Sequence, residues 1–143
     1  MARPNGCVFC QVVTGEVAAP IVLDSGQTLA FLDHRPLFPG HCLVIPKAHY
    51  ETLADLPAEL ASALFEKART IAAAMEGGLG CDGAFVAINN RVSQSVPHVH
   101  IHVVPRRKKD GLRGFFWPRQ KYSSEAEMER VRKILQEAMA RQN

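Results

Sequence analysis

The chain has 143 residues, of which 47% are hydrophobic, and a formal net charge of +3 at pH 7. This length fits one domain with its own core, and the composition is that of a globular protein. No run of apolar residues approaches the roughly 18 that a membrane span needs, and the first residues lead into no long apolar signal segment. We therefore expect a cytoplasmic protein without a membrane partner. A charge this mild gives no reason to expect a specific nucleic-acid partner.

Two of the four cysteines, Cys7 and Cys10, form a Cys-x-x-Cys pair ahead of the first predicted strand. Such a pair is either a redox motif or half of a zinc site. A thioredoxin-type redox motif would follow a strand in a βαβ unit, and this pair does not. Half a zinc site is therefore the first interpretation, provided that two more ligands exist downstream. Cys42 and Cys81 have no cysteine near them and are expected to be small buried side chains.

Three strands are predicted in the first third of the chain. Residues 21–23 and 28–32 are short apolar runs, and the turn residues 24–26 between them indicate an antiparallel hairpin. Residues 41–45 form the third run, which Pro46 is expected to end.

A long helix should follow these strands. Asp55 is a suitable N-cap, Pro57 would lie in the first turn, and Gly77-Gly78 is expected to end the helix. Apolar residues recur at helical spacing and predict a face that packs on the core: Leu60, Leu64, Ile71 and Met75.

Residues 84–88 predict a fourth strand and residues 98–104 a fifth, which Pro105 should close. The fifth carries His98, His100 and His102 at alternate positions, so all three imidazoles should share one face of the sheet. The simplest interpretation is a half-buried strand with some polar surface, but histidine has no special strand preference. A row of nucleophiles, acid–base groups or metal ligands is the alternative, because neutral imidazole fills all these roles near pH 7.

The last part of the chain contains a basic stretch at residues 106–109, an aromatic patch at 115–117 and a predicted helix. The basic stretch is either a solvated loop or a surface that attracts phosphate-bearing ligands. Ser124 and Glu127 fit a capping box, and an apolar stripe behind them predicts docking on the body or on a partner subunit. We expect one α+β domain over residues 1–143. It would have a five-stranded antiparallel sheet, one long inserted helix and a C-terminal helix.

Five blocks of the sequence, in order and in rough spacing, resemble the histidine triad (HIT) superfamily. The last block contains the family signature, His-φ-His-φ-His-φ-φ, where φ is apolar. The resemblance covers a core of residues 7–105 and is less specific over 106–143. It implies an α+β fold that usually extends across a homodimer, binds purine nucleotides and cleaves at the α-phosphate of a nucleotide. The blocks are residues 7–10, 30–33, 39–49, 87–90 and 94–104.

The resemblance also implies roles for individual residues. His100 corresponds to the nucleophile that becomes nucleotidylated, and His102 would contact the phosphate or the leaving group. Asp33 would accept hydrogen bonds from the ribose hydroxyls. Phosphate contacts are implied for Asn89, Gln94 and Ser95, and Phe9 and Phe31 would line the base pocket. The family often has a glycine where this chain has Ser93, so the phosphate loop departs from the family pattern at this position.

Zinc-containing members of the family imply a metal site. The corresponding residues here are Cys7, Cys10, His49 and His98. Two thiolates and two imidazoles suit tetrahedral zinc with all four positions filled by protein, which makes the site structural. The alternative leaves the cysteines free and places His98 in a hydrogen-bonded relay behind His100.

The expected activity is hydrolysis of adenosine nucleotides at the α-phosphate through a covalent intermediate on His100. Candidate substrates are diadenosine polyphosphates, adenosine phosphoramidates and adenylates. Transferases of the superfamily tend to carry glutamine at the third triad position, so His102 favours hydrolysis over transfer. Phosphorolysis of dinucleotides and a nucleotide-binding module without significant turnover remain the alternatives.

Overall fold

The computed structural model describes residues 4–113 and 119–142. The chain divides into two compact units, Met1–Asp110 and Gly111–Asn143. No helix among the described residues has the length and apolar character needed to cross a membrane. In chain order the elements are α1 (Val8–Thr14), β1 (Ile21–Ser25), β2 (Thr28–Leu32), β3 (Cys42–Pro46), η1 (Leu53–Asp55), α2 (Ala58–Leu79), β4 (Gly83–Ala87), β5 (Ile101–Arg106) and α3 (Glu125–Ala140).

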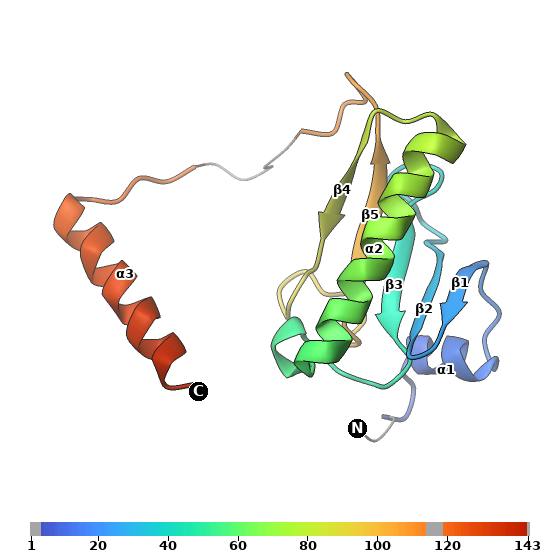
Figure 1. The fold of residues 1–143 in the computed structure, drawn as a ribbon, viewed down its shortest axis with the longest axis horizontal. Helices are drawn as coiled ribbons and strands as arrows, with labels where there is room; N and C mark the ends of the chain where they lie inside the picture. The colour runs from blue at the N-terminus through green and yellow to red at the C-terminus, as the bar shows by residue number, and fades with distance from the viewer. Residues whose placement is uncertain (1–3, 114–118, 143) are drawn as a thin grey trace. The chain divides into compact units, whose positions relative to one another are not determined.

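The five strands form one antiparallel sheet in the order β1-β2-β3-β5-β4 (Figure 1). This confirms the expected α+β fold. β1 and β2 form the predicted hairpin, while β3 and β5 lie in the middle of the sheet. β4 forms one edge and pairs with β5 alone among the described strands.

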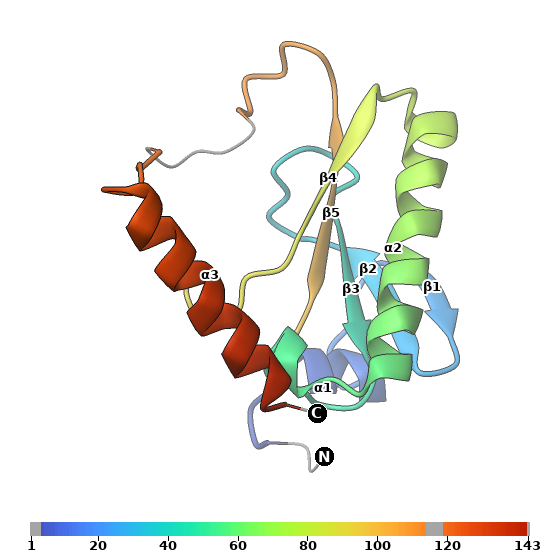
Figure 2. The ribbon, with the colours of Figure 1, turned by 60° about the vertical axis from the view of Figure 1, so that its left-hand side comes forward.

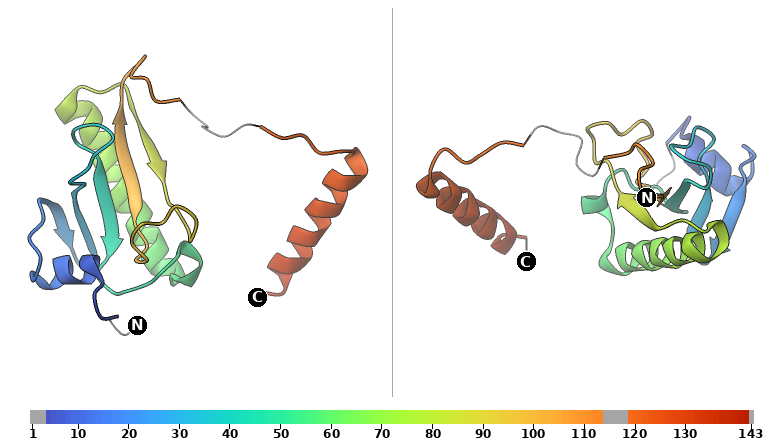
Figure 3. Two further views of the ribbon diagram at one scale, coloured as in Figure 1. Left: turned by 180° about the vertical axis from the view of Figure 1, so that it is seen from behind. Right: turned by 90° about the horizontal axis from the view of Figure 1, so that it is seen from above.

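Alternation along the strands divides the core into two layers, one on each face of the sheet. Ala30, Val44 and Ile101 pack with helix α2, whereas Phe31 and Leu43 pack with the short helix α1. Figures 2 and 3 show α2 along one face of the sheet and α1 at the opposite side. Because neighbouring strand residues point to opposite faces, the histidines that alternate with Ile101 lie on the α1 face.

Helix α2 differs from its predicted limits at both ends. Asp55 caps the preceding turn η1, where its carboxylate accepts hydrogen bonds from the backbone and hydroxyl of Thr52 at 3.0 and 2.8 Å. Pro57 is the N-cap of α2. The helix continues through Gly77-Gly78 and ends at Gly80, whose φ of +64° is the left-handed conformation that favours glycine. Glycine weakens a helix interior by about 1 kcal/mol but does not have to end it.

The observed limits of two strands also differ from the predicted ones. β3 begins at Cys42 and includes Pro46, while β5 begins at Ile101 and includes Pro105. Each proline lies in the last two residues of its strand, where the missing N–H costs at most one ladder hydrogen bond. His98 and His100 therefore precede β5. The segment between them is held by a 2.7 Å hydrogen bond from the Val99 amide to the Tyr50 carbonyl.

In the second unit, α3 begins as predicted after Ser124, whose hydroxyl accepts from the Glu127 amide at 3.1 Å. The reciprocal bond of a capping box is replaced, because the Glu127 carboxylate accepts from Ser123. No residue of α3 is buried. Docking of its apolar stripe stays a prediction: Met128, Val131, Leu135 and Ala138. The predicted aromatic patch at 115–117 lies outside the described residues.

Candidate functional site

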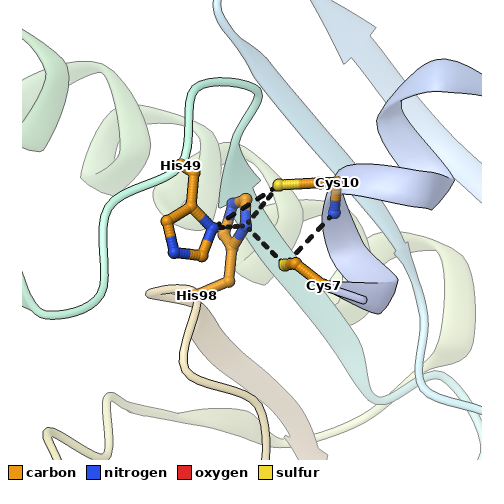
Figure 4. Close-up of side chains that lie close together, drawn as sticks. All are labelled: Cys7, Cys10, His49 and His98. Carbon is orange, nitrogen blue, oxygen red and sulfur yellow. Dashed lines mark hydrogen bonds between the residues drawn. The ribbon is translucent and has the colours of Figure 1, made fainter. Parts of the chain in front are cut away.

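The first cluster of functional side chains joins the N-terminal helix to the sheet. Cys7 is the N-cap of α1, and its sulfur accepts from the Cys10 amide at 3.5 Å. Positions three residues apart lie on one side of a helix, so both sulfurs face the same way. His49 follows β3 and His98 precedes β5. Figure 4 shows the four side chains converging from these three segments.

Distances within this cluster match a tetrahedral metal site. The His98 Nδ1 atom lies 3.5 Å from Cys7 Sγ, 3.6 Å from Cys10 Sγ and 3.2 Å from His49 Nδ1. The remaining Cys10 Sγ to His49 Nδ1 distance is 3.5 Å. A tetrahedron built on normal Zn–S and Zn–N bonds has S···N edges of about 3.6 Å and N···N edges of about 3.3 Å. The four residues thus have the spacing, as well as the chemistry, of a zinc site.

The protonation state of His98 also suits a metal site. Its Nε2 atom lies 2.8 Å from the Pro46 carbonyl, which can only accept, so Nε2 carries the hydrogen. In a neutral ring the lone pair is then on Nδ1, which faces the two sulfurs and His49. Burial is the largest cause that lowers the pKa of His98 to about 4, so the ring is neutral at pH 7. A carbonyl partner on the remote nitrogen is typical of a histidine that binds metal.

His100 has the opposite tautomer. Its Nδ1–H donates to the His98 carbonyl at 2.8 Å, which leaves the lone pair of the neutral ring on Nε2. The residue is only 4% exposed, and burial lowers its pKa. The edge of Phe9 packs against the ring at a centroid distance of 5.1 Å. His100 is thus held rigidly with an unprotonated nitrogen available for attack.

His41 belongs to this site, although no motif in the sequence marked it as a functional residue. It is 3% exposed, and its Nδ1 accepts from the Leu37 amide at 3.1 Å. The hydrogen of neutral His41 is therefore on Nε2, which donates to His102 Nδ1 at 3.0 Å. This contact leaves His102 with its own hydrogen on Nε2. Strand alternation could have identified His41. It lies two residues before Leu43 and so shares its face of the sheet, and Leu43 pairs with His102 in the β3–β5 register.

Asp33, His41 and His102 lie close enough together to resemble a second metal site. The hydrogen bond from Leu37 argues against that use, because His41 presents an N–H rather than a lone pair to the cluster. His102 is neutral as well: burial first, then His100 and His41, lower its pKa to about 4, while Asp33 acts in the other direction. Within this cluster His41 and His102 are hydrogen-bonded, and the Asp33 carboxylate lies 3.8 Å from His41 Nε2.

A pocket of about 400 Å³ lies beside the triad on the α1 face. Phe9 and Phe31 pack edge to face at 5.4 Å on its apolar side. Its polar lining contains Asp33, Ser95, His100 and His102. Six of the predicted substrate and catalytic residues therefore meet at one cavity, which combines an apolar slot with hydrogen-bonding groups.

Asn89 and Gln94 are not among the described residues that line this pocket. The Gln94 side chain instead makes hydrogen bonds within the protein. Its Nε2 donates to the Glu51 carbonyl at 2.6 Å, and its Oε1 accepts from the Arg91 amide at 2.8 Å. Ser93 has a φ of +60°, a conformation in which glycine is favoured.

Comparison with known proteins agrees with this geometry. The family model described as HIT domain matches residues 14–109. Adenylylsulfatase HINT3 of Arabidopsis thaliana is 36% identical over 110 residues, which are 76% of this chain and 56% of that relative. The chain thus spans little more than half of the Arabidopsis protein.

Two other proteins match over more of their length. Adenosine 5′-monophosphoramidase HNT1 of Saccharomyces cerevisiae is 33% identical over 94% of this chain and 82% of its own. The structure of a Zn-bound histidine triad family protein from Mycobacterium smegmatis is 37% identical, with a TM-score of 0.72 over 94% of this chain and 96% of that one. The matched model, these relatives and the triad of histidines beside one pocket show that the chain belongs to the histidine triad (HIT) family.

Proposed function

We propose that the protein hydrolyses adenosine nucleotides at the α-phosphate through a covalent nucleotidyl intermediate on His100. The observation that carries this proposal is the tautomer of His100, whose unprotonated Nε2 lies at a pocket of nucleotide size. Relatives named as an adenylylsulfatase and an adenosine 5′-monophosphoramidase support the reaction class. Substrates would be phosphoramidates, adenylates or diadenosine polyphosphates.

The pocket offers a complementary partner to each part of such a substrate. The base would lie against Phe9 and Phe31, whose rings contact each other edge to face and form the apolar side of the pocket. Asp33 has a carboxylate with two acceptor oxygens, which suits the ribose diol, although one oxygen also accepts from the Arg35 amide at 2.9 Å. The α-phosphate would then lie against His100 and His102, with Ser95 in the same polar lining.

The proposed reaction has two displacements at phosphorus. In the first, the Nε2 lone pair of His100 forms an N–P bond, and the bond to the leaving group breaks with its electron pair. An amine leaving group takes a proton from solvent, and a phosphate leaving group needs none. In the second, water attacks phosphorus, its proton goes to solvent, and the N–P electron pair returns to Nε2. The His98 carbonyl holds Nδ1–H throughout and stabilises the positive charge of the nucleotidylated ring.

His102 acts in this scheme as a hydrogen-bond donor. A neutral ring with a lowered pKa is a poor proton source, but its Nε2–H can stabilise charge on a non-bridging phosphoryl oxygen. Donors placed in this way are worth roughly 10²–10³ in rate. His41 positions the donor by holding the other nitrogen.

Cys7, Cys10, His49 and His98 are proposed to hold a structural zinc ion. The ion would cross-link α1 to the sheet and supply no reacting group, since protein fills all four positions. A homodimer is also proposed, because β4 forms a sheet edge and Val86 on it is 42% exposed. The cytoplasmic location stays a prediction.

A substrate panel tests the proposed activity. Adenosine 5′-phosphoramidate, an aminoacyl adenylate and a diadenosine polyphosphate would be compared with and without added phosphate. We expect release of AMP, abolished in His100→Ala and retained in Gln11→Ala, a control on α1 outside the pocket lining. Phosphate-dependent release of ADP would indicate phosphorolysis. No turnover of any of the three substrates would refute the enzyme and leave a binding module.

A further inference from the structure

We propose that the metal centre and the nucleotide pocket are thermodynamically coupled through helix α1. Metal binding would tighten nucleotide binding, and nucleotide would tighten metal binding by the same factor. The inference rests on the proposed function, since it takes the pocket beside the triad to be the nucleotide site.

Phe9 is the physical link, because it lies between the two cysteine ligands in sequence and faces both sites. Its ring contacts the metal-cluster residue His98 at a centroid distance of 5.8 Å and the proposed nucleophile His100 at 5.1 Å. The same ring packs on Phe31 at 5.4 Å and lines the pocket. A shift of α1 therefore changes the apolar slot and the surroundings of His100 together.

A metal would add an anchor to the short helix α1, beyond the packing of its buried residues Phe9, Cys10 and Val12. α1 has seven residues, far fewer than the roughly 12–15 at which an isolated helix becomes even marginally stable in water. Its N-cap is Cys7, the sulfur of which is also a metal-cluster atom. Bonds from Cys7 and Cys10 to a metal that is also held by His49, which follows β3, and His98, which precedes β5, would fix the helix at both ends of its first turn.

His98 provides a second connection between the two sites. Its side chain points Nδ1 into the metal cluster, while its backbone carbonyl accepts the Nδ1–H of His100 at 2.8 Å. Movement of His98 on loss of the metal would disturb the hydrogen bond that fixes the tautomer of the nucleophile. One residue thus serves both sites.

Coupling of this kind is reciprocal. If metal lowers the dissociation constant of a nucleotide by a given factor, nucleotide must lower the dissociation constant of the metal by that factor, and factors of roughly 5–150 are typical. The predicted sign is positive in both directions.

The test measures two equilibria on the full chain without turnover. AMP binding is measured by calorimetry on zinc-loaded protein and on protein stripped with a chelator. Zinc affinity is measured by competition with a chromophoric chelator, with and without saturating AMP. We expect the AMP dissociation constant to rise at least about fivefold on stripping, and zinc affinity to rise by the same factor with AMP.

Two variants on α1 separate local coupling from general destabilisation. Phe9→Ala leaves all four proposed ligands in place. In this variant AMP should no longer change zinc affinity, so the ratio of zinc affinities with and without AMP should be close to one. Gln11→Ala should keep the wild-type factor. This comparison starts from zinc-loaded protein, so it decides the matter even if the stripped chain does not fold. The coupling would be overturned if AMP raised the zinc affinity of Phe9→Ala by the wild-type factor. Equal AMP dissociation constants for zinc-loaded and stripped wild-type protein would also overturn it. Absence of AMP binding to loaded wild type would instead overturn the proposed function.

Discussion

The hydrogen-bond partner of one ring nitrogen determines what the other nitrogen of each triad histidine can do. The Pro46 carbonyl takes the Nε2–H of His98 and leaves Nδ1 for the metal cluster. The His98 carbonyl takes the Nδ1–H of His100 and leaves the Nε2 lone pair for the proposed attack on phosphorus. His41 donates to Nδ1 of His102 and leaves Nε2–H as a donor. These hydrogen bonds suit the three histidines to the three different roles that we propose for them.

Substitution of His41 tests this division at the level of a single hydrogen bond. His41→Ala removes the donor to His102 Nδ1, so His102 is no longer confined to the Nε2–H tautomer. We expect kcat to fall by roughly 10²–10³, the cost of losing one charge-stabilising donor, while KM changes less. His41→Gln keeps an N–H near that position and should recover part of kcat. Steady-state kinetics that give the same kcat for both variants would contradict this role.

The lowered pKa of His102 predicts how stability depends on pH. The folded-state pKa is about 4, against 6.5 for the free side chain, with burial as the main cause and His100, His41 and Asp33 as the facing groups. Between these values the unfolded state binds more protons, so the contribution of His102, present above pH 6.5, is lost as pH falls toward 4. Urea unfolding at pH 7.5 and 4.5 should show a smaller pH effect in His102→Asn. If the unfolding free energy changed equally with pH in wild type and in His102→Asn, the lowered pKa of His102 would be refuted.

At the scale of elements, alternation and turn chemistry predicted most of the fold. They gave the β1–β2 hairpin, the order of the strands in the chain and the common face of the triad. They did not give the end of α2, because a glycine pair weakens a helix without stopping it, whereas Gly80 adopts the left-handed conformation. His41 was also missed, since its partner His102 is set by the β3–β5 register, which lies beyond local sequence.

Two glycine substitutions test where α2 ends. Gly77→Ala lies inside the helix with nothing within 4 Å of the added methyl group, so it should stabilise the protein by about 0.5–1 kcal/mol. Gly80→Ala must adopt a φ of +64° and should destabilise it by about 1 kcal/mol. Denaturant unfolding that gives the opposite order would favour the end at Gly77-Gly78.

At the scale of the whole molecule, the Cys7, Cys10, His49 and His98 cluster ties the N-terminal segment to the sheet. We expect one zinc ion per chain by metal analysis, and a fall in the melting temperature when a strong chelator removes it, because the metal binds the folded chain. Cys7→Ser should lose zinc. Cys42→Ala should retain it, since Cys42 is buried in the core layer under α2. Undiminished zinc in Cys7→Ser would refute the ligand set.

The proposed reaction passes through a covalent intermediate on His100, and trapping that intermediate tests the reaction most directly. Protein would be mixed with a diadenosine polyphosphate, quenched during turnover, digested and analysed by mass spectrometry. We predict an AMP adduct on the peptide that contains His100, absent in His100→Ala and formed more slowly in His102→Ala. Release of AMP by wild type without any adduct, or undiminished turnover by His100→Ala, would contradict it.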